Sequence, residues 1–173
     1  MSEKIDISDP SLNIEIFCGG KLPNDFQFDL EDQELAEFYN EDAEKCQKES
    51  ISLVKDVFYH GKLIAYFAYT SSEIKCDHLS SNDQIINFAH PALKLGRLLV
   101  CKSMRGRGIG SVILQDIART ALDLKNKIPL RFIIVDSLPH AVKFYMKQGF
   151  IDSGIKRGKE RDLSLLYIDL SRL

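Results

Sequence analysis

The chain has 173 residues, 45% hydrophobic and 28% charged, which suits one globular domain with a single core. Its formal net charge of −2 provides no overall field that would attract nucleic acid or a membrane surface. No apolar run is long enough to cross a bilayer, and no charged-then-apolar leader begins the chain, so we expect a cytoplasmic protein.

The cysteines and histidines show no metal-ligand pattern. The four cysteines are dispersed without C-x-x-C spacing, which predicts reduced thiols and not a zinc site or a disulfide framework. The four histidines also lack ligand spacing, so no metal is expected. These residues are Cys18, Cys46, Cys76, Cys101, His60, His78, His90 and His140.

The first half of the chain predicts a loose tail, a strand, a helix and a hairpin. Residues 1–13 are polar and are expected to form the tail, before a strand at Ile14–Phe17. A helix is predicted over Glu31–Glu49, because apolar residues recur at helical spacing and acids at its start suit the helix dipole. The runs Ser52–Tyr59 and Leu63–Thr70 are typical of two strands joined by a tight turn.

The second half alternates strands and helices. Residues 71–91 are irregular and predict a long connection of the kind that is usually functional or mobile. A strand at Leu95–Val100, a helix over about Gly108–Asn126 and a strand at Leu130–Val135 follow. This order predicts a parallel strand pair with a crossover helix. The adjacent apolar pair Leu98 and Leu99 is compatible with a β-bulge or with a strand buried on both faces.

The end of the chain adds a short helix and a terminal strand. The helix is predicted over about Leu138–Gln148, with Ser137 as its cap and Gly149 as its left-handed stop. The terminal strand is predicted at Leu163–Leu170. The fold class that follows is a single mixed α/β domain over residues 1–173, with about six to seven strands and flanking helices.

A glycine-rich turn, Arg105–Gly110, opens the helix that follows the strand Leu95–Val100. Such a turn leaves backbone N–H groups aimed past the helix end, where the dipole favours an anion such as pyrophosphate. Glycine permits both the close approach and positive φ. No Gly-Lys-Ser/Thr follows, so the pattern is not a Walker loop. It is not the dinucleotide G-x-G-x-x-G either, since the glycines read G-x-G-x-G and Cys101–Met104 separate them from the strand. An ordinary solvated turn is the alternative.

Two stretches resemble the GNAT family of N-acetyltransferases. The R-x-x-G-x-G pattern of Arg105–Gly110, after Leu98–Val100, resembles that family's acetyl-CoA pyrophosphate loop. Val135–Phe150 resembles its aliphatic strand, helix, Phe-Tyr and Gly-Phe. The resemblance implies the GNAT fold and direct attack of an amine on acetyl-CoA in a ternary complex, with expulsion of the coenzyme A thiolate.

A third stretch, Phe28–Phe38, resembles the first helix of a subset that includes toxins acetylating the amino group of aminoacyl-tRNA. That subset commonly reads F-D-C-G before the helix, whereas Leu30 and Glu31 stand here in place of Cys and Gly. The leading interpretation is therefore a small or peptidic amine acceptor. The alternatives are the tRNA-acetylating toxin with an antitoxin partner, which the near-neutral charge disfavours, and a non-catalytic module that binds coenzyme A. A homodimer is compatible with each.

The resemblance also implies which residues hold the cofactor. Backbone N–H groups from Arg105 to Ser111 would meet the pyrophosphate, with charge from the two arginines. The pantetheine arm would pair with the strand at Leu98 and Val100, where a splay would aim an N–H at the thioester oxygen. The implied cofactor-binding residues are Leu98, Leu99, Val100, Arg105, Gly106, Arg107, Gly108, Ile109, Gly110 and Ser111.

Tyr145 matches the family's helix tyrosine beside the cofactor sulfur and is the expected general acid, protonated at neutral pH. From the residues alone, Phe144 and Tyr145 also read as a core aromatic pair. No general base is identifiable: Asp136, Glu73 and His90 are candidates by position only. The basic run Lys156–Arg161 is typical of a solvated turn, with contact to tRNA or cofactor phosphates as the alternative.

Overall fold

The computed structural model of the chain describes residues 4–75, 89–158 and 162–172. The predictions made for Cys76, for His78 and for the last three residues of the basic run fall outside these ranges. The chain divides into two compact units, the first made of residues 1–70 and 96–116 and the second of residues 71–95 and 117–173. The single domain over the whole chain stays a prediction.

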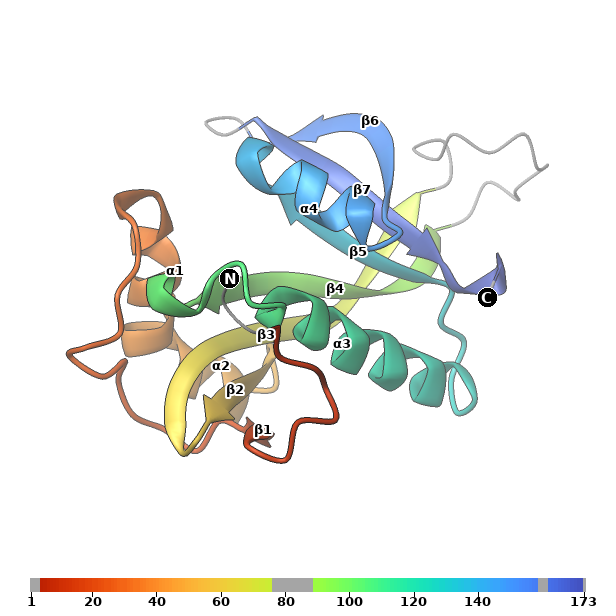
Figure 1. The fold of residues 1–173 in the computed structure, drawn as a ribbon. Helices are drawn as coiled ribbons and strands as arrows, with labels where there is room; N and C mark the ends of the chain where they lie inside the picture. Colours follow the sequence, from red (N-terminus) through yellow and green to blue (C-terminus); the bar gives the residue numbers. More distant parts are fainter. Residues whose placement is uncertain (1–3, 76–88, 159–161, 173) are drawn as a thin grey trace. The chain divides into compact units, whose positions relative to one another are not determined.

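Seven strands are hydrogen bonded in the order β1-β2-β3-β4-β5-β7-β6 (Figure 1). β3 (Lys62–Lys75) and β4 (Ala89–Val100) run from one unit into the other. β4 pairs in parallel with β5 (Phe132–Ser137), and helix α3 (Ile109–Lys125) connects the two strands along the chain. The predicted parallel pair with a crossover helix is therefore confirmed, as is the mixed α/β class.

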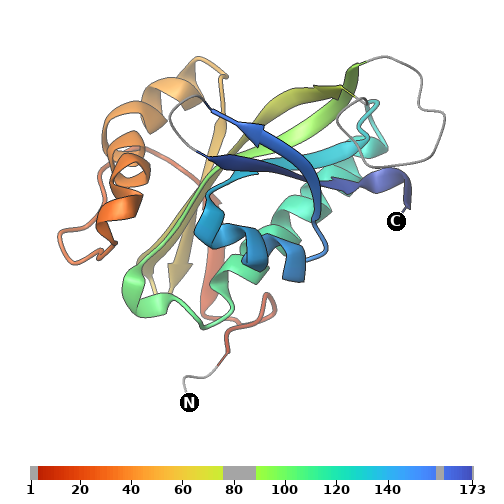
Figure 2. The same cartoon turned by 90° about the horizontal axis from the view of Figure 1, so that it is seen from above.

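The first unit packs a helical segment against its strands. β1 (Leu12–Ile16) and β2 (Leu53–Tyr59) pair antiparallel, and β2 pairs antiparallel with β3. The predicted helix consists of a 3₁₀ turn at Leu30–Asp32, α1 (Gln33–Glu37), a π-helical turn at Phe38–Asp42 and α2 (Ala43–Lys48). Figure 2 shows this segment, in orange, beside the strands. Tyr39, Phe17, Tyr66 and Leu99 are among its shared core residues.

The start of the chain differs from the predicted loose tail. Ile5 is 5% exposed, and its N–H donates to the carbonyl of Arg107 at 2.8 Å. From Leu12 onward the chain is already strand β1. One isoleucine within a polar stretch produces no periodic signal, so its anchoring role was not visible in the sequence.

The second unit is built on β5, β6 (Ile151–Arg157) and β7 (Leu163–Asp169). β7 pairs antiparallel with both β5 and β6. The short helix is a 3₁₀ turn at Pro139–Ala141 followed by α4 (Val142–Lys147), which packs on β7 (Figure 1). Gly149 has φ 92°, as predicted for a helix stop.

The second unit differs from the sequence-based expectations in three respects. Ser137 ends β5 and makes no side-chain cap, since its hydroxyl donates to the Leu138 carbonyl at 3.0 Å. β6 was not predicted, and it holds the first two residues of the basic run. Its alternation is interrupted where Gly154 has φ 77° and the register with β7 shifts. The expected connection at 71–91 is shorter, because β3 extends to Lys75 and β4 starts at Ala89.

A buried carboxyl group lies in the core of the first unit. Asp56, in β2, is 7% exposed and accepts a hydrogen bond of 3.0 Å from the Tyr39 hydroxyl. Burial raises the pKa of Asp56 from 3.8 to about 6, and the carboxylate of its cross-strand partner Glu15 adds to this rise. The Tyr39 hydrogen bond opposes the rise without cancelling it.

The raised pKa predicts a pH-dependent cost to stability. The folded state binds more protons than the unfolded state between about pH 4 and 6, so the contribution of Asp56 to the unfolding free energy falls as pH rises through that window. The melting temperature of Asp56→Asn, relative to wild type, should therefore rise between pH 4 and pH 7.5. We expect a rise of about 2–4 °C, which corresponds to about 1 kcal/mol in a protein of this size.

Glu49→Gln removes an exposed carboxylate and is the matched control, whose melting temperature should stay within about 1–2 °C of wild type, as for most exposed substitutions. Scanning calorimetry at both pH values measures each variant. An Asp56→Asn difference that is independent of pH would show that Asp56 titrates normally.

Candidate functional site

The glycine turn lies between β4 and α3 in the first unit. After Val100, a 3₁₀ turn at Lys102–Met104 leads to Arg105, and the helix starts at Ile109. Gly106 has φ 76° and Gly108 has φ 93°, conformations that L side chains rarely adopt. The predicted positive φ is thus confirmed at these two glycines.

The two glycines differ in how much space surrounds their Cα atoms. A Cβ atom at Gly108 would lie 2.9 Å from the carbonyl oxygen of Ile5, so the chain's own N-terminal segment already occupies the approach to this residue. A Cβ atom at Gly106 would meet nothing within 4 Å. Gly108 is therefore required by the packing of the protein, whereas Gly106 leaves open space beside the turn.

The first turn of α3 presents backbone donors. The N–H groups of Ile109, Gly110 and Ser111 lie in this turn, where a helix offers no acceptor one turn earlier. The N–H of Val112 bonds to the Gly108 carbonyl at 3.1 Å and begins the regular ladder. The Ile109 side chain is 1% exposed, so this residue offers only its backbone. A 17-residue helix adds partial positive charge at this end.

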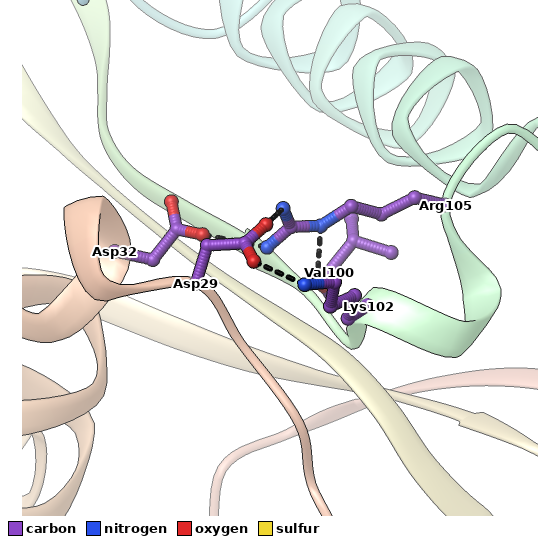
Figure 3. A network of polar contacts seen from close by, with 5 residues as sticks. All are labelled: Asp29, Asp32, Val100, Lys102 and Arg105. Carbon is purple, nitrogen blue, oxygen red and sulfur yellow. Dashed lines mark hydrogen bonds and ion pairs between the residues drawn. The ribbon is translucent and has the colours of Figure 1, made fainter.

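Arg105 is held by three acceptors (Figure 3). Its Nε donates to the Val100 carbonyl at 3.1 Å, one terminal nitrogen donates to Asp29 at 2.8 Å and the other to Asp32 at 2.6 Å. Lys102 also donates to Asp29, and this ammonium lowers the pKa of that carboxyl. The guanidinium thus links the end of β4 to the segment that starts the first helix.

Arg107 is also engaged within the first unit. Its guanidinium lies over the Tyr59 ring, 5.6 Å from the centroid, and donates to the Met104 sulfur at 3.4 Å. The predicted contribution of the two arginines to phosphate binding stays a prediction, but both side chains have protein partners.

The end of β4 alternates between the two faces of the strand. Leu99 is 1% exposed and belongs to the core of the first unit, while Leu98 and Val100 are half-buried. The side chains of such a strand cover its two faces, so its backbone N–H and C=O groups are accessible only along its edges. The pairing of a cofactor with Leu98 and Val100 stays a prediction.

Tyr145 lies in the second unit, on α4. It is 7% exposed, with its ring centroid 5.1 Å from that of Phe144 and 5.4 Å from that of Phe150. Burial raises the pKa of the Tyr145 phenol above its usual range, so the group keeps its proton at every physiological pH. Tyr145 is therefore part of an aromatic cluster and its phenol stays protonated, while its role as general acid stays a prediction.

Of the three base candidates, Asp136 is ion paired, His90 has a buried ring nitrogen, and the third is exposed. The Asp136 carboxylate pairs with Lys94 at 2.6 Å and with Arg157 at 3.6 Å, so its negative charge is already neutralised. His90 lies edge-on to Phe132 at 5.9 Å, with Nε2 buried and without a hydrogen-bond partner among the described residues. Glu73 is exposed on β3. The general base stays unassigned.

Sequence reasoning missed the acidic partners of the glycine turn. The acids near the first helix were interpreted as favourable charges at a helix start, yet Asp32 is buried and ion paired. Asp29 and Asp32 lie 76 and 73 residues from Arg105 in the chain, which no local pattern can connect. The F-D pair in the resemblance was the one available signal.

The described residues contain no group of three or more side chains arranged to hold a metal ion. Cys18, Cys46 and Cys101 are free thiols. In the same described part of the chain, no helix combines the length and apolar character needed to cross a membrane.

Comparison with known proteins assigns the chain to a family. The family described as "Acetyltransferase (GNAT) domain" matches residues 29–166, which includes the glycine turn and Tyr145. No curated protein matches the sequence.

Solved structures share the fold at low sequence identity. A tyrosine-to-phenylalanine mutant of KacT has a TM-score of 0.77 and 21% identity, covering 94% of this chain and 96% of that chain. AtaT complexed with acetyl-methionyl-tRNAfMet has a TM-score of 0.73 and 20% identity, covering 93% and 96%. An AtaT mutant toxin bound to the C-terminus of the antitoxin AtaR and acetyl-CoA has a TM-score of 0.71 and 17% identity, covering 94% and 95%.

Proposed function

The chain belongs to the GNAT acetyltransferase family, and we propose that it transfers acetyl from acetyl-CoA to the amino group of an aminoacyl-tRNA in the cytoplasm. The neutral acceptor amine attacks the thioester carbonyl and its nitrogen releases a proton to water, which leaves a tetrahedral oxyanion. The oxyanion collapses and expels the coenzyme A thiolate, which takes up a proton. The protein must therefore bind the cofactor, stabilise the oxyanion and supply that proton.

The backbone from Arg105 to Ser111 binds the cofactor's pyrophosphate in this proposal. Unpaired N–H groups at a helix start, together with the helix dipole, form an anion site without needing a cationic side chain. Gly106 leaves the space that a phosphate oxygen requires. The engagement of both arginines by protein partners makes the backbone the main phosphate ligand.

The pantetheine arm pairs with the backbone of β4 at Leu98 and Val100, as an added strand would. An N–H of this strand then stabilises the oxyanion, and one such donor contributes about 3–4 kcal/mol to the transition state. Tyr145 donates the proton to the thiolate. Its buried phenol is protonated at neutral pH, which supports this role.

Exposed positive charge on helix α4 supports a polyanionic acceptor. Lys143 and Lys147, one turn apart beside Tyr145, are both exposed, and no described acid forms an ion pair with either. The net charge of −2 conceals an uneven distribution. Residues 71–95 and 117–173 contain 13 Lys and Arg against 9 Asp and Glu, whereas the remaining residues contain 10 against 16. The acetyl-methionyl-tRNAfMet complex of AtaT supports the same class of acceptor.

A small or peptidic amine is the second candidate acceptor. The departure of Leu30 and Glu31 from F-D-C-G favours it. An antitoxin partner would accompany the tRNA function, as AtaR accompanies AtaT.

Substitution of Gly106 tests the cofactor site. Asp and Asn both tolerate positive φ and have nearly the same shape, so they differ mainly in charge. Gly106→Asp should bind acetyl-CoA about tenfold more weakly than Gly106→Asn, a difference of about 1.4 kcal/mol, because its carboxylate repels the pyrophosphate. Isothermal titration calorimetry measures both affinities, and equal affinities in the two folded variants would contradict the site.

Tyr145→Phe tests the proton donor. The change removes only the hydroxyl, so acetyl-CoA affinity should stay within a few-fold of wild type. The kcat should fall about 10²-fold, because the proton moves only as the thiolate leaves. Rapid-quench kinetics establishes that chemistry limits the rate. A wild-type kcat under that condition would make Tyr145 a packing residue only.

Charge reversal on α4 tests the acceptor. Lys143→Glu/Lys147→Glu should weaken binding of aminoacyl-tRNA and reduce the slope of log K against log salt by about 1–2, since each phosphate contact contributes about one. Arg119→Glu/Lys127→Glu reverses two exposed charges elsewhere in the second unit and is the control. Equal losses in the two double variants, or acetylation of small amines but not of charged tRNA, would favour the second candidate.

A further inference from the structure

We propose that Arg105 is a positioning residue that holds the glycine turn in its cofactor-binding conformation, and that it is not a ligand of the cofactor's phosphates. The inference rests on the proposed function, because it concerns the same turn. Under this proposal, Asp29 and Asp32 support acetyl-CoA binding by holding Arg105, without touching the cofactor themselves.

The Arg105 guanidinium connects separate segments of the first unit. Arg105 uses Nε and both terminal nitrogens on three acceptors of the protein: the Val100 carbonyl, Asp29 and Asp32. The planar fork of arginine fits such an arrangement, and the single ammonium of lysine cannot reproduce it. Because Arg105 directly precedes Gly106, its side-chain bonds fix the place where the turn begins (Figure 3).

A second set of contacts connects the same two segments, the one before the first helix and the one that leads into the glycine turn. The backbone N–H of Lys102 donates to the Gln27 carbonyl at 2.7 Å, and its ammonium donates to Asp29. The segment before the first helix is thus attached to the turn by backbone and side chains together. The two cations and two carboxylates balance, so the cluster offers no net positive charge to an arriving phosphate.

Release of Arg105 toward a phosphate would be costly. The guanidinium would have to leave Asp32, which is 7% exposed and would remain buried without its cation. Loss of one partner from a buried ion pair leaves an uncompensated charge, which is strongly destabilising. The pair is therefore expected to persist when the cofactor binds.

The two roles of Arg105 predict opposite effects of neutralising Asp32. If Arg105 were a phosphate ligand, Asp32→Asn would free its charge and tighten acetyl-CoA binding. If Arg105 positions the turn, Asp32→Asn weakens one of the contacts that hold Arg105 in place and therefore weakens acetyl-CoA binding. Arg105→Lys separates the roles in the same way, because it keeps the charge and loses the fork.

The experiment combines calorimetric titration with acetyl-CoA and amide hydrogen exchange of residues 106–111 in the cofactor-free protein. Arg105→Lys and Asp32→Asn should each weaken binding about tenfold, on the scale of misplaced binding groups. The double variant should bind acetyl-CoA no more weakly than the weaker-binding single variant, because both changes break the same linkage between Arg105 and Asp32. Exchange of the turn amides should accelerate in all three proteins.

Asp25→Asn breaks the exposed ion pair with Lys62 in the same unit and should change neither readout. If Asp32→Asn fails to fold, Asp29→Asn, at a more exposed carboxylate, replaces it. Tighter or unchanged binding in the carboxylate variant, or wild-type affinity in Arg105→Lys, overturns the proposal. The exchange readout needs no cofactor, so it is independent of the Gly106 test, whose failure would reject the cofactor site itself.

Discussion

The guanidinium of Arg105 joins the glycine turn and the end of β4 to the start of the first helical segment, which lies more than 70 residues earlier in the chain. It bonds to the Val100 carbonyl at the end of β4, and to Asp29 and Asp32 where the first helical segment begins. The glycine turn has two residues at positive φ, and its glycines contribute no side chain to packing, so bonds from outside the turn help to hold its conformation. The N-terminal segment adds one more bond from Ile5. A backbone anion site needs this rigidity, since its donors must be oriented before the ligand arrives.

The parts of the site that lie within one stretch of sequence were predictable, and those that depend on distant contacts were not. The glycine turn, α3 and the helix bearing Tyr145 have strong local signals, namely Gly spacing, helical periodicity and the stop at Gly149. The Arg105 cluster joins residues more than 70 positions apart, so its acids resembled ordinary helix-start charges. β6 was missed because Gly154 interrupts its alternation, and the anchoring of Ile5 was missed because one apolar residue makes no pattern.

The net charge does not describe the local electrostatic fields of this chain. A total of −2 hides an acidic first unit and a basic second unit, and an electrostatic partner responds to local fields within about one Debye length. Lys143 and Lys147 present such a local charge on the helix that carries Tyr145. The same uneven distribution lets a protein with a near-neutral total bind a polyanion while remaining acidic elsewhere.

In the proposed function, the backbone of the glycine turn binds the cofactor's pyrophosphate. Residue-resolved NMR hydrogen exchange, with acetyl-CoA or with S-acetylpantetheine, which lacks the pyrophosphate, tests it most directly. We expect saturating acetyl-CoA to slow exchange of the Gly106 amide and of the amides from Gly108 to Ser111, and saturating S-acetylpantetheine not to do so. Unchanged exchange at saturating acetyl-CoA, or equal protection by both compounds, would contradict it.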